Sequence, residues 1–206
     1  MTATTIPLCV PYWDEREAIA QGAKYTKELG FYIPADAYLD DVWNWLPRKW
    51  RYPDTPQLLP EMLPPSTWED NVRTALPQAK WDALRRYCYR ANGYRCEVCG
   101  VGGQVECHEN WQFDDTWAVQ HLTGLLCLCP LCHKSKHWGF AKRLGVLEEV
   151  KTKMCWVNGW TRRQLDQAER VAIAQCEERS QYHWTVDMSW LTEGRYHLVY
   201  RLDGNS

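Results

Sequence analysis

The 206-residue sequence predicts an α+β protein with a small N-terminal αβ module, a proline-rich linker and a larger domain that contains two cysteine pairs. Six prolines lie between residues 47 and 67, where they remove backbone donors and prevent a continuous helix. Two C-x-x-C pairs follow, with short turn-bounded stretches between them, and helical periodicity returns after the second pair. These observations place the domain boundaries at 1–47, 48–67 and 68–206.

In the N-terminal module, Asp14 and Glu17 have the spacing of a capping box, which predicts a helix that ends at Gly30. The apolar stretch 31–34 predicts a strand. In the following stretch, 37–46, apolar side chains recur at helical spacing and predict a second helix.

The large domain is expected to begin with a helix from Pro77 to Asn92, and residues 94–132 predict a β-hairpin. Three more helices are predicted after it, and two alternating segments at the end are expected to pair as a terminal hairpin. The helices should cover residues 132–142, 147–157 and 161–182, with Thr161 as an N-cap, and the hairpin strands residues 185–190 and 196–202.

Composition argues against a membrane protein, because no apolar run approaches the roughly 20 residues that a membrane span needs. The N-terminus lacks the features of a signal peptide, so we expect a cytoplasmic location. The ten cysteines then favour metal binding over disulfides.

Charge is unevenly distributed, although the formal net charge is only −2. Residues 1–70 carry 6 basic and 11 acidic side chains, residues 71–145 carry 10 and 6, and residues 146–206 carry 8 and 9. The balances of −5, +4 and −1 make the middle third the only basic part. We therefore expect a polyanion to bind there.

The two C-x-x-C pairs are Cys96-Glu-Val-Cys99 and Cys129-Pro-Leu-Cys132, separated by 29 residues. Each tight turn can present two thiolates to one tetrahedral ion, so the four cysteines predict a structural zinc site.

Histidines form a second candidate cluster. His133 and His137 are four residues apart, a spacing that places both side chains on one face of a helix. If a strand brings His108 opposite them, the three imidazoles make a second metal site with open coordination positions.

The stretch from about residue 70 to 140 resembles the zinc-knuckle branch of the HNH endonucleases. The resemblance is carried by Gly93-Tyr-Arg-Cys-Glu-Val-Cys-Gly, Glu106-Cys-His-Glu and Leu128-Cys-Pro-Leu-Cys-His-Lys-Ser-Lys-His. It implies a ββα-metal fold, in which a hairpin and a helix hold one catalytic divalent metal (Mg, Mn, Ni or Zn) and the cysteine knuckles brace them.

Position by position, the resemblance makes His108, His133 and His137 the ligands of the catalytic metal and places Glu109 at the general base, where the family usually has histidine. A second register makes His108 the base and moves ligation to Cys107 or Glu106. The middle Asn of the family has no counterpart, because Gly124 stands near its expected position.

Two functions follow as expectations. The first is a metal-dependent endonuclease acting on nucleic acid, with DNA as the expected substrate and phosphate contacts from the basic residues of one segment, Lys134, Lys136, Lys142 and Arg143. The alternative is a degenerate HNH scaffold that binds DNA or a protein as an inhibitor or adaptor. Residues 1–47 resemble a small module that accompanies plasmid primases and other mobile-element proteins, and a protein partner is expected through it.

Overall fold

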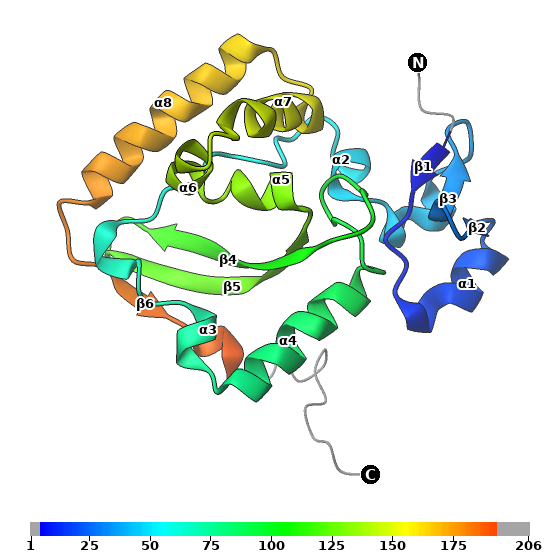
Figure 1. The fold of residues 1–206 in the computed structure, drawn as a ribbon, viewed down its shortest axis with the longest axis horizontal. Coiled ribbons are helices and arrows are strands. Elements are labelled where there is room, and N and C mark those ends of the chain that lie inside the picture. Colours follow the sequence, from blue (N-terminus) through cyan, green and yellow to red (C-terminus); the bar gives the residue numbers. More distant parts are fainter. Residues whose placement is uncertain (1–4, 193–206) are drawn as a thin grey trace.

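Two three-stranded sheets organise the chain in the computed structural model, which describes residues 5–192 (Figure 1). One sheet belongs to the N-terminal unit and the other lies at the centre of the larger unit, with helices on both of its faces. The predicted α+β class is confirmed.

The N-terminal sheet is antiparallel and has the order β1-β3-β2, with Ile6 and Ile33 paired across β1 and β3 and both buried. Its apolar face packs against Ala18, Val42 and Trp45 from the helical segments. The elements are β1 (Thr5–Pro7), η1 (Tyr12–Asp14), α1 (Glu15–Ala20), β2 (Lys24–Thr26), β3 (Gly30–Pro34) and the 3₁₀ helix η2 (Asp40–Trp45).

The strand predicted over 31–34 is present as β3, but two helix predictions in this unit were wrong in detail. The first helix ends at Ala20 rather than Gly30, because the chain turns at Gly22 in the left-handed region and continues as β2. Asp14 forms no capping box, since its carboxylate accepts a hydrogen bond from the Trp45 indole at 3.0 Å. The second expected helix is the short η2.

The segment expected as a linker begins with α2 (Arg48–Arg51) and ends at η3 (Pro65–Thr67). Between them, residues 56–64 run without regular secondary structure and are called the strap below (cyan in Figure 1). Leu58 of the strap is fully buried in the core of the larger unit. The side-chain amide of Asn158 accepts from the Leu58 N–H at 3.0 Å and donates to its C=O at 2.6 Å, which fixes the strap on that core.

The sheet of the larger unit contains the predicted hairpin, β4 (Glu106–Asp114) and β5 (Val119–Leu128), with β6 (Thr185–Asp187) parallel to β5. In the hairpin, His108 pairs with Leu126 and Glu109 with Leu125, and the register shifts between Asn110 and Trp111. Because strand side chains alternate, consecutive residues of β4 before this shift lie on opposite faces of the sheet.

The two sheet faces have different cores. Leu126 and Leu128 pack with Met154 and Val150 beneath the helices after the hairpin, whereas Leu122 packs on the other face with Trp81 and Leu84. The helices on the first face are α5 (Pro130–Lys134), α6 (Trp138–Arg143), α7 (Leu147–Asn158) and α8 (Arg162–Arg179), and those on the second are α3 (Val72–Ala75) and α4 (Gln78–Ala91).

Most helix predictions in this unit are confirmed, including α4 and the N-cap Thr161, whose side chain forms a capping box with Gln164. The helix expected over 132–142 is instead two helices, α5 and α6, with a break at residues 135–137. The first strand of the expected terminal hairpin pairs in parallel with β5 as β6, and η4 (Ser189–Leu191) follows; the second, 196–202, lies outside the described residues. No helix within 5–192 has both the length and the apolar character that crossing a membrane requires.

Gly100, in the first cysteine turn, lies against Pro7 of the N-terminal unit and against Pro47. A substitution at Gly100 therefore tests the contact between this turn and the N-terminal unit. Its φ is +74°, and a Cβ there would lie 2.5 Å from Cγ of Pro7 and 2.7 Å from Cγ of Pro47. We expect Gly100→Ala to lower the free energy of unfolding by at least ~1–2 kcal/mol, the cost of left-handed backbone alone. Urea unfolding measures this, with Gly139→Ala as the control, because a Cβ at Gly139 meets nothing within 4 Å. Equal stability of the two variants would contradict the contact.

Candidate metal centres

The first candidate centre consists of Cys96, Cys99, Cys129 and Cys132. All four are buried, and their sulfur atoms lie within 4.8 Å of one another. The Cys99 and Cys129 sulfurs are 3.8 Å apart. Two sulfurs bound to one tetrahedral Zn²⁺ at about 2.3 Å each stand about 3.8 Å apart, so the four thiols can hold a structural metal such as zinc.

Two tight turns position these sulfurs. In the first, the Gly100 N–H donates to the Cys96 carbonyl at 2.7 Å, and the Cys96 N–H donates to the Val101 carbonyl at 2.9 Å. In the second, Cys129 precedes α5 and Pro130 occupies the first helical position, where its missing N–H costs nothing. The 29 residues between the two turns contain the hairpin β4–β5, which doubles the chain back and brings the two turns together.

Hydrogen bonds within the cluster divide the four cysteines into two with a lowered pKa, Cys99 and Cys129, and two with a raised pKa, Cys96 and Cys132. Hydrogen bonds from Cys132 and Cys96 lower the pKa of Cys129 to about 7, and those from Cys129 and Cys132 lower the pKa of Cys99. Burial acts to lower the pKa of Lys153. The negative charge of Cys99 and its neighbours outweighs this effect, so the pKa of the lysine is raised overall. All ten cysteines of the chain are free.

The second candidate centre is the histidine cluster of His108, His133 and His137, which come from β4, α5 and the residue preceding α6. One ring nitrogen from each lies within 4.8 Å of the others, and Nε2 of His133 is 3.1 Å from Nε2 of His137. His108 is buried, at 2% exposure, and its ring centroid lies 5.2 Å from that of His133 and 4.9 Å from that of His137. The three side chains brought together by the structure are those that the sequence had suggested.

Two carboxylates adjoin the cluster. Oε2 of Glu106 contacts Nδ1 of His133, and Oε1 of Glu61 lies 3.2 Å from Nε2 of His108. Glu106, which the second register names as an alternative metal ligand, is two residues from His108 on β4, so strand alternation places both on one face. Sequence reasoning missed Glu61, which belongs to the strap and carries no local signal.

Burial governs the protonation of His133 and His137. It lowers the pKa of His137 to about 4, assisted by the positive charges that His133 and His108 would carry. It also lowers the pKa of His133, with His108 again contributing. Both imidazoles are therefore neutral near pH 7, the form that binds a metal.

Glu109 does not join the cluster. It follows His108 in β4 and therefore lies on the opposite face, where its carboxylate accepts a hydrogen bond from the Val72 N–H at 3.3 Å. The structure thus places the expected general base beside α3, away from the histidines. Cys107, the thiol of the second register, also lies on that face, packed against the core of Trp81 and Leu84.

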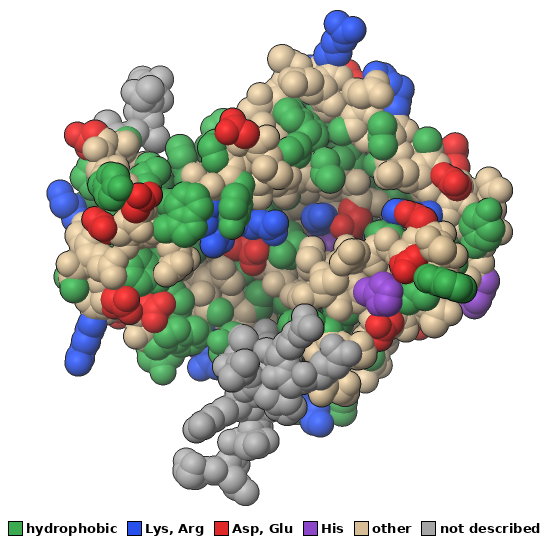
Figure 2. Space-filling view, turned by 180° about the vertical axis from the view of Figure 1, so that it is seen from behind, with side chains coloured by type: hydrophobic (Ala, Val, Ile, Leu, Met, Phe, Trp, Pro, Cys, Tyr) green, Lys and Arg blue, Asp and Glu red, His purple; other side chains and the backbone are tan. Residues whose placement is uncertain are grey.

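The expected phosphate-binding residues have different surroundings. Lys136 is only 13% exposed and donates to Oε2 of Glu61 at 3.1 Å, so its charge is engaged within the protein. Lys142 and Arg143 are exposed at the end of α6, and Lys134 is partly buried on α5. In the face drawn in Figure 2, Lys and Arg side chains alternate with acidic ones along a central hollow, and that face is not uniformly basic.

The position expected for the family's Asn is occupied by Gly124, which pairs with Asn110 across the hairpin. The Asn110 side chain donates to Oγ of Thr123 at 2.8 Å, and this hydroxyl in turn donates to the Asn110 carbonyl at 2.9 Å. An asparagine therefore braces the hairpin from the other strand.

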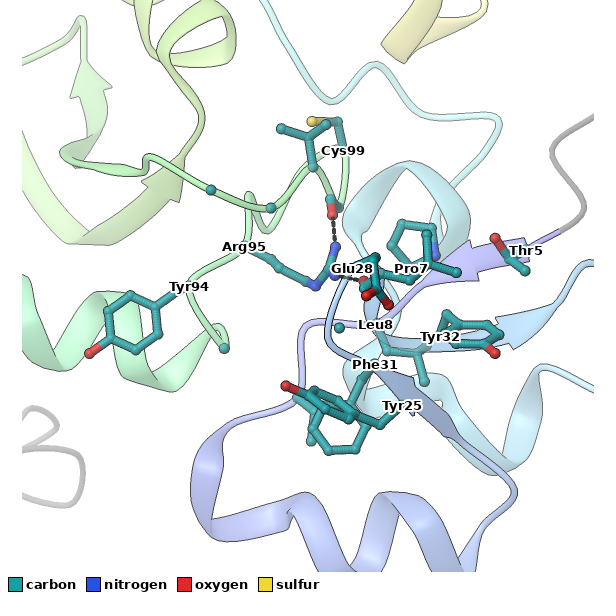
Figure 3. A pocket seen from close by; sticks show the side chains of 18 of the residues that line it. Thr5, Pro7, Leu8, Tyr25, Glu28, Phe31, Tyr32, Tyr94, Arg95 and Cys99 are labelled. Carbon is teal, nitrogen blue, oxygen red and sulfur yellow. Dashed lines mark hydrogen bonds between the residues drawn. The ribbon is translucent and has the colours of Figure 1, made fainter.

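A separate pocket of about 890 Å³ lies between the N-terminal unit and the first cysteine turn (Figure 3). Arg95 reaches into it, donating to the Gly100 carbonyl at 2.8 Å and to the Leu29 carbonyl. The guanidinium therefore ties the two units together. None of the three clustered histidines lines this pocket.

Comparison of the chain with protein-family models, with curated proteins and with solved structures found no match.

Proposed function

We propose that the chain is a metal-dependent endonuclease of the HNH type, which hydrolyses phosphodiester bonds of nucleic acid, with DNA as the expected substrate. The observation that carries this proposal is the convergence of His108, His133 and His137 beside the four-cysteine cluster. Cys132 and His133 are consecutive residues of α5, so a metal bound by the thiols would brace the helix that presents the histidines.

The donor set fits a divalent cation. Nδ1 of His108 is buried without a hydrogen-bond partner, an arrangement that costs free energy unless an ion or another group meets it. Glu106 contacts Nδ1 of His133, so Nε2 of that ring is directed to the cluster. In metal sites a histidine commonly bonds a carboxylate through the nitrogen that does not bind the metal.

In the proposed reaction the three histidines would hold the divalent metal, which when bound supplies Lewis-acid stabilisation of charge on the scissile phosphate and the leaving oxygen. His133 and His137 are neutral near pH 7 and available as ligands. The exposed Lys142 and Arg143 would contact phosphates of the nucleic-acid backbone in a salt-dependent manner.

The proposal is tested by incubating the purified chain with supercoiled plasmid, single-stranded DNA and RNA in the presence of Mg²⁺, Mn²⁺, Ni²⁺ or Zn²⁺. We expect cleavage that depends on the added metal and is lost in His108→Ala. Absence of cleavage of every substrate with every metal would contradict the proposal.

Glu109 gives a further prediction, because its carboxylate lies on the opposite face of β4. Glu109→Gln keeps an oxygen acceptor for the Val72 N–H, so we expect both cleavage and thermal stability to stay near those of the wild type. A nuclease assay and a thermal melt check this. A loss of cleavage of the size found for His108→Ala would restore Glu109 as the general base.

A second candidate function is a binding module on a catalytically degenerate HNH scaffold. It is favoured by one observation: Glu109, expected as the general base, lies on the opposite face of β4 from His108 and contacts Val72 instead. One tightly bound zinc per chain, with nucleic-acid binding unchanged by His133→Ala and His137→Ala, would support this alternative. A second, exchangeable metal would support the nuclease.

A further inference from the structure

The strap places a partly buried glutamate, Glu61, against the histidine cluster. The Glu61 side chain is 14% exposed, and both of its oxygens are engaged: Oε1 with Nε2 of His108 at 3.2 Å and Oε2 with the Lys136 ammonium at 3.1 Å. A buried carboxylate is costly unless it is paired and hydrogen-bonded, and both conditions are met here.

The backbone of the strap is held at Glu61 and again at Leu58, three residues earlier. The Glu61 N–H donates to the Ser135 carbonyl at 3.3 Å, in the break between α5 and α6. Three residues earlier, Leu58 is fully buried and bonded through both backbone groups to Asn158 of α7. Glu61 is therefore presented by a fixed main chain and not by a free loop.

This contact engages Nε2 of His108 and leaves Nδ1 as the ring nitrogen that is free for a ligand. With Nε2 directed at a carboxylate, the proton belongs on Nε2 and the lone pair on Nδ1. Nδ1 is buried and has no hydrogen-bond partner. Glu106 contacts His133 in a comparable way: its carboxylate is bonded to Nδ1, and Nε2 faces the cluster.

We propose that Glu61 is a positioning residue of the histidine metal site, which fixes His108 in the Nε2-protonated tautomer and directs Nδ1 to the metal. This inference rests on the metal site of the proposed function. It extends that site to the strap, which lies outside the stretch of about residues 70–140 that resembles the HNH family. The segment between the two units would then be part of the metal site.

The test compares Glu61→Gln with Glu109→Gln, the same chemical change at the glutamate on the opposite face of β4. Loss of a carboxylate behind a metal-binding histidine typically weakens metal affinity about 10–100-fold. We expect the Ni²⁺ dissociation constant of Glu61→Gln, measured by calorimetric titration of the zinc-loaded protein, to rise by this factor, and that of Glu109→Gln to stay unchanged. Equal affinities in the two variants would overturn the proposal.

Glu61→Gln also leaves the Lys136 ammonium without its carboxylate, which could destabilise the fold. The comparison is therefore repeated in the Lys136→Met background, where no unpaired ammonium remains. We expect Glu61→Gln to weaken Ni²⁺ binding by the same factor there. A loss that disappears in this background would assign the effect to Lys136 and contradict the positioning role.

Histidine NMR separates this inference from the proposed function. Long-range ¹H–¹⁵N spectra report the tautomer of each histidine in zinc-loaded protein without added Ni²⁺. We expect the Nε2–H form at His108 in the wild type and in Glu109→Gln, and a mixture in Glu61→Gln. If the wild type binds no second metal, the proposed metal site fails, and the spectra alone still decide what Glu61 does to His108. An unchanged tautomer in Glu61→Gln would overturn its role.

Discussion

Cys132→Ser is expected to lose its structural metal and to unfold the larger unit. The four cysteine side chains are themselves part of the core, together with Leu58 and Met154. Structural Zn²⁺ contributes about 10–16 kcal/mol to the folded state of small zinc-binding peptides. The whole net stability of a domain is about 5–15 kcal/mol, so this loss cannot be absorbed.

Metal analysis and circular dichroism measure both consequences. The wild type should contain one tightly bound zinc per chain and melt cooperatively, and Cys132→Ser should contain none and show no cooperative transition. Cys155→Ser is the matched control, because Cys155 is free, partly buried and outside the cluster. A Cys132→Ser variant that keeps its zinc and its melting temperature would contradict the assignment.

His133→Ala is expected to abolish metal-dependent cleavage while the chain stays folded around its zinc. The variant removes the ligand that Glu106 orients and leaves two imidazoles, His108 and His137. Since Lewis-acid stabilisation by a catalytic metal is worth several kcal/mol, its loss should reduce the cleavage rate at least about 100-fold.

The control for this experiment is His183→Ala, because His183 is exposed and lies outside the cluster. Cleavage rates at saturating Mn²⁺ or Mg²⁺ and zinc content should be measured on the same samples. A His133→Ala variant that cleaves as fast as His183→Ala would show that the histidine cluster is not the catalytic centre.

The cysteine cluster could be predicted from sequence because each C-x-x-C pair is a local turn. The turn fixes two sulfurs, and only the meeting of the two turns depends on the rest of the fold. The histidine pair was predicted for a partly wrong reason. His133 and His137 do not share a helix, since α5 ends at Lys134, yet the break between α5 and α6 still brings their rings together.

The separation of Glu109 from the histidine cluster has a physical origin in strand alternation. The family resemblance aligned Glu109 with a base beside its neighbour, but in β4 consecutive side chains lie on opposite faces. The contact of Glu61 could not be predicted in this way. It depends on the path of the strap, which is fixed by Asn158, about 100 residues further along the chain.

Anomalous diffraction from crystals of the zinc-loaded protein soaked in Mn²⁺ or Ni²⁺ tests the central claim most directly. We predict a zinc peak among the four cysteine sulfurs. Data collected at the X-ray absorption edge of the added metal should show a second peak about 2.0–2.2 Å from one nitrogen each of His108, His133 and His137. A peak at the cysteines with none at the histidines, in crystals where the cluster is open to solvent, would contradict a catalytic metal site.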